Sequence, residues 1–131
     1  MRVNKIFFII ILILFTPFNS NADFDWKKVG KNTGGSVFFV DKSSIKKTRN
    51  ITYFYLLADY SKPDQGVLSV KTYIEGNCNK SKYRFLKDIY FAEPMGNGNI
   101  IETINEAGEW TPYDNSQIMG VIMKYVCEFR F

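Results

Sequence analysis

Few side chains of this chain could take part in chemistry. It has no histidine among its 131 residues, so a serine hydrolase that uses histidine as its base is excluded. Met95–Gly98 contains two glycines, but no helix is expected to follow it, and a phosphate-binding loop needs one. The acidic residues show no spacing that favours a catalytic pair: Asp59, Asp88, Glu93, Glu102 and Glu106. The sequence therefore predicts a protein that is not an enzyme and uses no cofactor or metal ion.

The two cysteines, Cys78 and Cys127, are predicted to form a disulfide. An even number of cysteines in an exported protein is typical of disulfide pairing. The bond would close a loop of about 50 residues and stabilise the fold by about 4 kcal/mol in the chain-entropy description. The alternative is a pair of free or metal-binding thiols. The absence of histidine and of a CxxC motif disfavours it.

Export is predicted from residues 1–22. The first five residues carry two positive charges, ten apolar residues follow at 6–15, and Ser20 and Ala22 supply the small side chains of a cleavage site. Ten apolar residues are too few for a membrane span, which needs about 20. Cleavage after Ala22 would leave a single domain at 23–131, in the periplasm or secreted. No cysteine lies near the cleavage point to carry a lipid, so we expect no stable membrane anchor.

The net charge of the mature domain gives no indication of nucleic-acid binding. The whole chain has a net charge of +4, and cleavage would leave 15 basic against 13 acidic side chains. Such a small excess does not predict binding to a phosphate backbone. Two basic groups remain as candidate contacts for an acidic polysaccharide, a protein or a membrane surface, with an ordinary solvated surface as the alternative. They are a basic loop of Lys42, Lys46, Lys47 and Arg49, and a second group of Lys80, Lys82, Arg84 and Lys87.

The mature sequence indicates strands followed by one helix. Its short connections predict an antiparallel sheet, and the helical spacing of apolar residues near the end predicts a helix at 116–129. The fold class is therefore α+β: an antiparallel sheet of five or six strands with the C-terminal helix packed on one face. The disulfide would join that helix to the strand turn at Cys78. The expected strands are 24–29, 36–41, 51–59, 67–75, 81–92 and 100–104.

Three details of these elements can be checked. The strand at 51–59 is apolar on both sides, which indicates a central position. Asp41 is expected to cap a single helical turn that follows it. In the strand at 81–92, strict alternation would place Tyr83, Phe85, Ile89 and Phe91 on the same side.

Aromatic side chains are abundant, at 17% of the chain. Tyrosine and arginine are enriched in protein contact patches, so part of this surplus is a candidate binding face. The alternative is ordinary cross-strand packing under the helix. The candidate binding face consists of Tyr53, Tyr55, Tyr73, Lys82, Arg84 and Lys87.

A series of landmarks runs through the mature chain: Trp26, Val40-Asp41, Ser43-Ser44-Ile45, Ala58-Asp59-Tyr60, Ser69, Cys78, Arg84, Met95-Gly96-Asn97-Gly98, Trp110 and Cys127. In this order and spacing the series resembles the surface-adhesin protein E family of Gram-negative bacteria. The resemblance implies a small antiparallel sheet, a C-terminal helix and a disulfide between them. The founding member is an outer-membrane lipoprotein that binds host matrix and serum proteins such as laminin and vitronectin.

The expected function combines this resemblance with the composition. We expect an exported, non-enzymatic binding protein of the cell envelope that recognises an extracellular-matrix or serum protein through an exposed sheet face. A second copy of the chain is a further candidate partner. The missing lipid-bearing cysteine leaves surface display open and motivates the alternative, a periplasmic structural or accessory protein without a host ligand.

Overall fold

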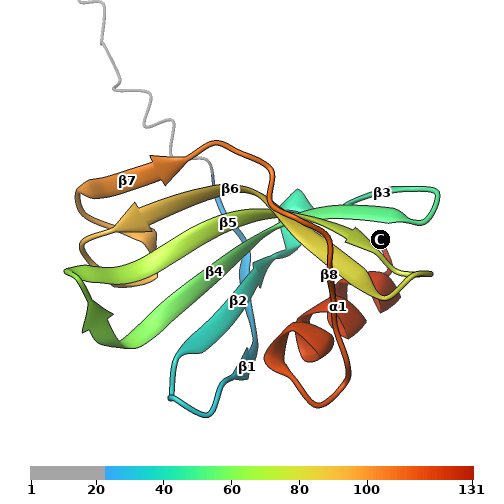
Figure 1. The fold of residues 1–131 in the computed structure, drawn as a ribbon, viewed down its shortest axis with the longest axis horizontal. Helices are drawn as coiled ribbons and strands as arrows, with labels where there is room; N and C mark the ends of the chain where they lie inside the picture. Colours follow the sequence, from blue (N-terminus) through green and yellow to red (C-terminus); the bar gives the residue numbers. More distant parts are fainter. Residues whose placement is uncertain (1–22) are drawn as a thin grey trace, which may run out of the picture.

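The computed structural model describes residues 23–131, and the predicted signal peptide at 1–22 lies outside the described residues. The chain forms a curved antiparallel sheet with one helix beside it (Figure 1). Six strands follow in the order β1-β2-β4-β5-β6-β7, while β3 pairs with β4 and β8 pairs with β6. The predicted fold class is confirmed, with two short strands beyond the expected five or six. The strands are β1 (Trp26–Lys31), β2 (Val37–Asp41), β3 (Lys46–Thr48), β4 (Ile51–Asp64), β5 (Val67–Asn77), β6 (Lys82–Phe91), β7 (Ile100–Ile104) and β8 (Thr111–Pro112).

The sheet has two different faces, which we call the helix face and the outer face. Phe54 and Leu56 of β4 point to the helix face and belong to the core cluster that includes α1 (Ile118–Glu128). Leu57 points to the outer face and is fully buried, where the short 3-10 turn η2 (Pro94–Gly96) lies against it. The predicted central strand is therefore covered on the helix face and, at Leu57, on the outer face as well.

The hydrophobic core lies between the sheet and α1. Helix residues at intervals of three and four project onto the sheet because 3.6 residues complete a turn. Each large side chain buried in this way stabilises the fold by about 1.5–3 kcal/mol. The fully or almost fully buried members are Val40, Ile45, Phe54, Leu56, Ile74, Ile122, Met123 and Val126.

The helix begins at Ile118, two residues later than predicted. Its N-cap is Gln117, whose side chain makes no capping hydrogen bond, while the Asp114 carboxylate instead accepts one from the Ser116 amide at 2.8 Å. A Cβ atom at Gly120 would lie 1.9 Å from the Asp114 carbonyl oxygen. Glycine at this position therefore lets the preceding loop fold back onto the first turn of the helix.

A β-bulge at Leu86 changes the predicted orientation of β6. Phe85 pairs with Ile74, whereas Lys87 pairs with Tyr73, so Leu86 has no partner in β5. The extra residue reverses the alternation beyond it. The expectation that four apolar residues of this strand share one side was therefore wrong: Phe85 lies on the helix face, and Ile89 lies on the outer face.

The helical turn predicted after Asp41 is present as the 3-10 turn η1 (Lys42–Ser44). The Asp41 carboxylate accepts hydrogen bonds from the Ser43 amide at 3.0 Å and the Ser43 hydroxyl at 2.6 Å. It also accepts one from the Asp25 amide at 2.9 Å. This buried aspartate thereby fixes the segment that leads into β1 as well as the end of β2.

Candidate functional site

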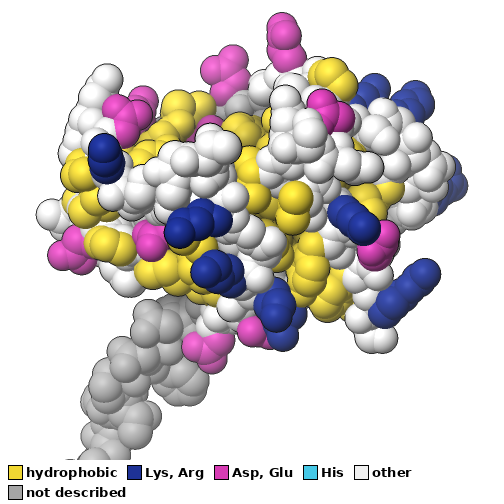
Figure 2. Space-filling view, turned by 90° about the horizontal axis from the view of Figure 1, so that it is seen from below, with side chains coloured by type: hydrophobic (Ala, Val, Ile, Leu, Met, Phe, Trp, Pro, Cys, Tyr) yellow, Lys and Arg dark blue, Asp and Glu magenta, His cyan; other side chains and the backbone are white. Residues whose placement is uncertain are grey.

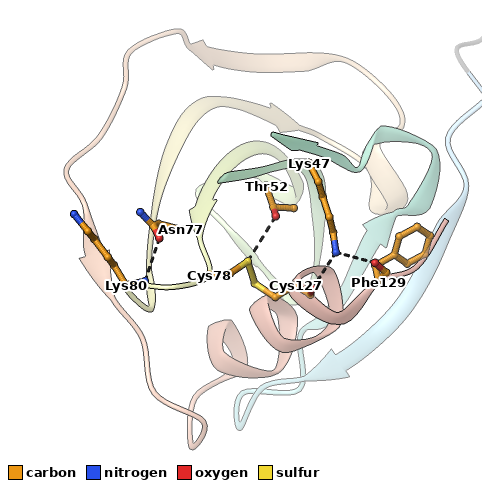
Figure 3. The surroundings of a disulfide bond; sticks show 7 residues. All are labelled: Lys47, Thr52, Asn77, Cys78, Lys80, Cys127 and Phe129. Carbon is orange, nitrogen blue, oxygen red and sulfur yellow. Dashed lines mark hydrogen bonds between the residues drawn. A yellow bond between two sulfur atoms is a disulfide. The ribbon is translucent and has the colours of Figure 1, made fainter. Parts of the chain in front are cut away.

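Cys78 and Cys127 form the predicted disulfide (Figure 3). Their Cα atoms are 5.9 Å apart, and 49 positions separate them in sequence. Cys78 follows β5 directly, and Cys127 lies in the last turn of α1. The bond therefore ties the end of the helix to the sheet, as the sequence predicts.

Lys47 holds the same end of the helix (Figure 3). Its ammonium group donates hydrogen bonds to the carbonyl oxygens of Cys127 at 2.9 Å and Phe129 at 2.7 Å. The last carbonyls of a helix have no partner within it, so a lysine placed there satisfies them. Loss of hydration on burial lowers the pKa of Lys47, and the positive charge of Arg130 lowers it further. Lys47 therefore has a structural role, which the sequence did not indicate.

The predicted basic loop is not a loop. Lys46 and Lys47 belong to β3, which pairs with the start of β4, and only Arg49 lies in the turn between these strands. Lys42 lies in η1, with its ammonium group 3.4 Å from the Asp25 carboxylate. Strand alternation separates the other two lysines, because Lys46 pairs with Tyr53 of the outer face and Lys47 with Thr52 of the helix face. Lys47 therefore lies on the opposite face of the sheet from Lys46 and does not share a basic patch with it.

The outer face carries a row of aromatic rings, which we call the aromatic row: Trp26, Phe24, Tyr55, Tyr73 and Tyr53. The Phe24 ring stacks on Trp26 with centroids 5.0 Å apart and meets Tyr55 edge-on at 6.0 Å. Tyr55 and Tyr73 are paired across β4 and β5, with centroids 4.7 Å apart, and Tyr53 lies 6.1 Å from Tyr73. Burial raises the pKa of Tyr73, and its two tyrosine neighbours raise it further.

Basic side chains border the aromatic row. Lys87 pairs with Tyr73 across β5 and β6. The Lys71 ammonium group lies 3.9 Å from the centre of the Phe24 ring, a distance suited to a cation–π contact. Burial lowers the pKa of Lys71, Asp41 opposes this shift, and Lys87 adds to it. The row therefore combines exposed ring surface with positive charge.

The six predicted residues of the candidate face share the outer face by strand register, but two of them are engaged within the molecule. Arg84 forms a salt bridge with Glu75 at 2.9 Å and lies 4.8 Å from the Trp110 ring centre. Lys82 lies 5.1 Å from the same ring. Tyr53, Tyr55, Tyr73 and Lys87 remain half-exposed and close to one another.

The sequence did not place Phe24, Trp26, Lys71 and Trp110 in this candidate face. The aromatic pair at the start of the mature chain and the alternation of the 67–75 strand were signals for the first three. In the view of Figure 2, hydrophobic side chains are exposed in several patches, with Lys and Arg side chains among them. Surface composition alone therefore does not distinguish the aromatic row, whereas its ring contacts do.

Two of the carboxylates that could do chemistry have roles in holding the sheet and its loops together. Asp59 accepts a hydrogen bond from the Met95 amide at 2.9 Å, which fixes the loop around η2, and Asp88 accepts one from the Thr72 hydroxyl at 2.7 Å. Residues 23–131 contain no group of three His, Cys, Asp or Glu side chains placed to hold a metal ion. Within the same residues, no helix has the length and hydropathy needed to cross a membrane.

Comparison with solved structures gives the same fold. Haemophilus influenzae protein E in its crystal form II matches with a TM-score of 0.61 and 16% identity, covering 78% of this chain and 86% of that chain. Protein E from non-typeable Haemophilus influenzae matches with a TM-score of 0.57 and 16% identity, covering 78% of this chain and 74% of that one. At this level of identity the likeness concerns the fold alone.

The sequence pattern of a family adds to this structural likeness. The pattern described as Surface-adhesin protein E matches residues 26–128, from the first residue of β1 to the last residue of α1. This stretch includes both cysteines of the disulfide and most of the aromatic row. The chain therefore belongs to the Surface-adhesin protein E family.

Proposed function

We propose that the processed protein is an exported, non-enzymatic binding protein of the cell envelope that recognises another protein through its outer face. The single observation that supports this most strongly is the aromatic row, whose rings contact one another but are half-exposed. Rigid aromatic side chains provide large contact areas at low entropic cost and are frequent at the energetic centres of protein interfaces. Family membership supports an adhesin-like role.

The charge around the row suggests the kind of partner. Lys71, Lys87 and Lys46 lie on the same face as the rings, and within residues 23–131 none of the three forms a salt bridge. Complementary charge across an interface mainly accelerates association and makes it sensitive to salt. An acidic surface of a host matrix or serum protein fits this arrangement.

Binding of residues 23–131 to immobilised laminin and vitronectin tests the proposal, with a non-family protein of equal net charge as the control. We expect saturable binding that weakens with salt and falls at least tenfold in Trp26→Ser. Lys87→Gln should weaken binding less and reduce its salt dependence. Binding no stronger than that of the charge-matched control would contradict the proposal.

A second candidate partner is another copy of the chain. All five residues of β7 are exposed, including Ile100 at 59% and Ile101 at 47%, and β7 lies at the edge of the sheet (Figure 1). The free edge of such a strand can pair with a strand of another molecule. Light scattering after size exclusion should report a dimer, and Ile101→Lys should shift it to monomer. A monomer at all concentrations would exclude self-association.

The alternative of a periplasmic structural or accessory protein is motivated by the sequence, in which Cys78 is the first cysteine. Protease treatment of intact cells distinguishes the two locations. Degradation of the protein on intact cells supports adhesion, whereas protection until the outer membrane is opened supports the periplasmic alternative.

A further inference from the structure

The helix face contains a groove at the border of the core cluster, on the opposite side of the sheet from the aromatic row. It has a volume of about 350 Å³ and crosses the sheet beside the first turn of α1. Ligand sites of proteins commonly have about 300–1,000 Å³ and mainly apolar walls. Its apolar walls are formed by Phe38, Leu56, Val70, Phe85, Ile118 and Met119. The groove can therefore receive an apolar side chain, and the 37% exposure of Phe85 shows that its wall is accessible.

One end of the groove is polar and acidic. Asp88 lines it together with Tyr60 and Tyr90, and these two tyrosines also line an adjoining hollow of about 210 Å³ that contains Asp64 and Glu102. No lysine or arginine lines either space within the described residues. The charge at this end is opposite in sign to that of the outer face, where basic side chains border the aromatic rings.

The carboxylates at this end of the groove contribute to the raised pKa values of its two tyrosines. Burial raises the pKa of Tyr60, and Asp64 and Asp88 raise it further. Burial also raises the pKa of Tyr90, with further contributions from Asp88, Tyr60 and Glu102. Negative charge and electron-rich rings together favour a cationic group, because both attract it.

The bulge at Leu86 gives Asp88 its position. Without the extra residue, strict alternation would turn Asp88 to the outer face. With the bulge, Asp88 pairs with Thr72 and accepts its hydroxyl hydrogen bond at 2.7 Å through one carboxylate oxygen. Within residues 23–131 no basic side chain forms a salt bridge with Asp88, so its charge is available to a ligand.

We propose that this groove binds a basic peptide segment, holding one arginine or lysine side chain at Asp88 and a neighbouring apolar side chain against Phe85 and Met119. Two observations point to this occupant: the apolar walls and the charge complementarity of the acidic end. The site lies on the opposite face of the sheet from the aromatic row, so it is independent of the proposed adhesive function.

Titration calorimetry with residues 23–131 and the peptide acetyl-Leu-Phe-Arg-Leu-amide tests the proposal. We expect saturable binding that weakens about tenfold when citrulline replaces arginine, because a charge-assisted contact is lost. Asp88→Asn should weaken binding by a similar factor, and Phe85→Ala should weaken it several-fold. Glu106→Gln, which removes an exposed acid outside the groove, should bind like the unmodified protein.

Amide chemical shifts from NMR spectra of the unmodified residues 23–131 locate the site. This measurement does not depend on the Asp88→Asn variant remaining folded. Shifts on peptide addition should concentrate at Tyr60, Asp88, Tyr90 and Met119, with none at Tyr73. Equal binding of the arginine and citrulline peptides would overturn the proposal, as would shifts confined to the aromatic row or no binding at millimolar peptide. Binding of free hexylamine as tightly as the peptide would overturn the choice of a peptide ligand.

Discussion

The two faces of the sheet differ in how their apolar side chains are used. On the helix face, Phe54 and Ile74 are fully buried under α1, and the disulfide and Lys47 both fix the end of that helix. On the outer face, Tyr55 and Tyr73 contact each other but remain half-exposed. The difference suggests that stability depends mainly on the helix face and recognition mainly on the outer face. Substitutions on one face or the other should therefore change stability and partner binding separately.

Removal of the disulfide should have the largest effect on stability. In Cys78→Ser/Cys127→Ser we expect the free energy of unfolding to fall by about 4 kcal/mol, because the unfolded chain is no longer constrained. Hydrogen exchange should show that the amides of α1 lose more protection than those of β4 and β5. An equal loss across the sheet would show that the bond does not act mainly on the helix.

Gly120→Ala should destabilise the protein by about 1–3 kcal/mol, because the new methyl group would overlap the Asp114 carbonyl. Helix propensity alone predicts the opposite sign, a gain of about 1 kcal/mol. Thermal unfolding decides between them. Gly34→Ala is the control, since its Cβ would meet no atom closer than 3.5 Å. A higher melting temperature for Gly120→Ala would contradict the close packing of this loop.

Lys47→Met should reduce the free energy of unfolding by about 1–2 kcal/mol, because two carbonyl groups at the end of α1 lose a charged donor. Lys46→Met, one residue away in the same strand but exposed, should change it little. Urea unfolding of the two variants provides the measurement. Equal effects would mean that the hydrogen bonds of Lys47 do not contribute to stability.

Alkaline pH should produce the smallest effect. The pKa values of Tyr60, Tyr73, Tyr83 and Tyr90 are raised above 10.0, in each case first by burial. The folded state therefore favours the neutral phenol groups. The stability that this preference contributes is fully present below pH 10 and is lost as the pH rises through the raised pKa values. Absorbance at 295 nm should show part of the tyrosines ionising above pH 10. Ionisation of all tyrosines near pH 10 would contradict the burial.

The fold was largely predictable because strand alternation and helical spacing depend on the sequence of each segment alone. The β7 bounds, the Asp41 cap and the cysteine pair all followed from local patterns or residue counts. The bulge at Leu86 did not, because pairing with β5 determines it. The role of Lys47 depends on a contact 80 positions away in the sequence. For the same reason, the sequence predicted three tyrosines of the aromatic row but not Phe24 or Trp26.

The central claim is that the outer face recognises a partner while the helix face maintains the fold. The most direct test is Tyr55→Ser/Tyr73→Ser, measured for both laminin binding and melting temperature, with Tyr113→Ser as a tyrosine control outside the aromatic row. We predict that the double variant loses at least tenfold in affinity, melts within a few degrees of the unmodified protein and differs in affinity from the control. Unchanged binding by a folded double variant would contradict the claim.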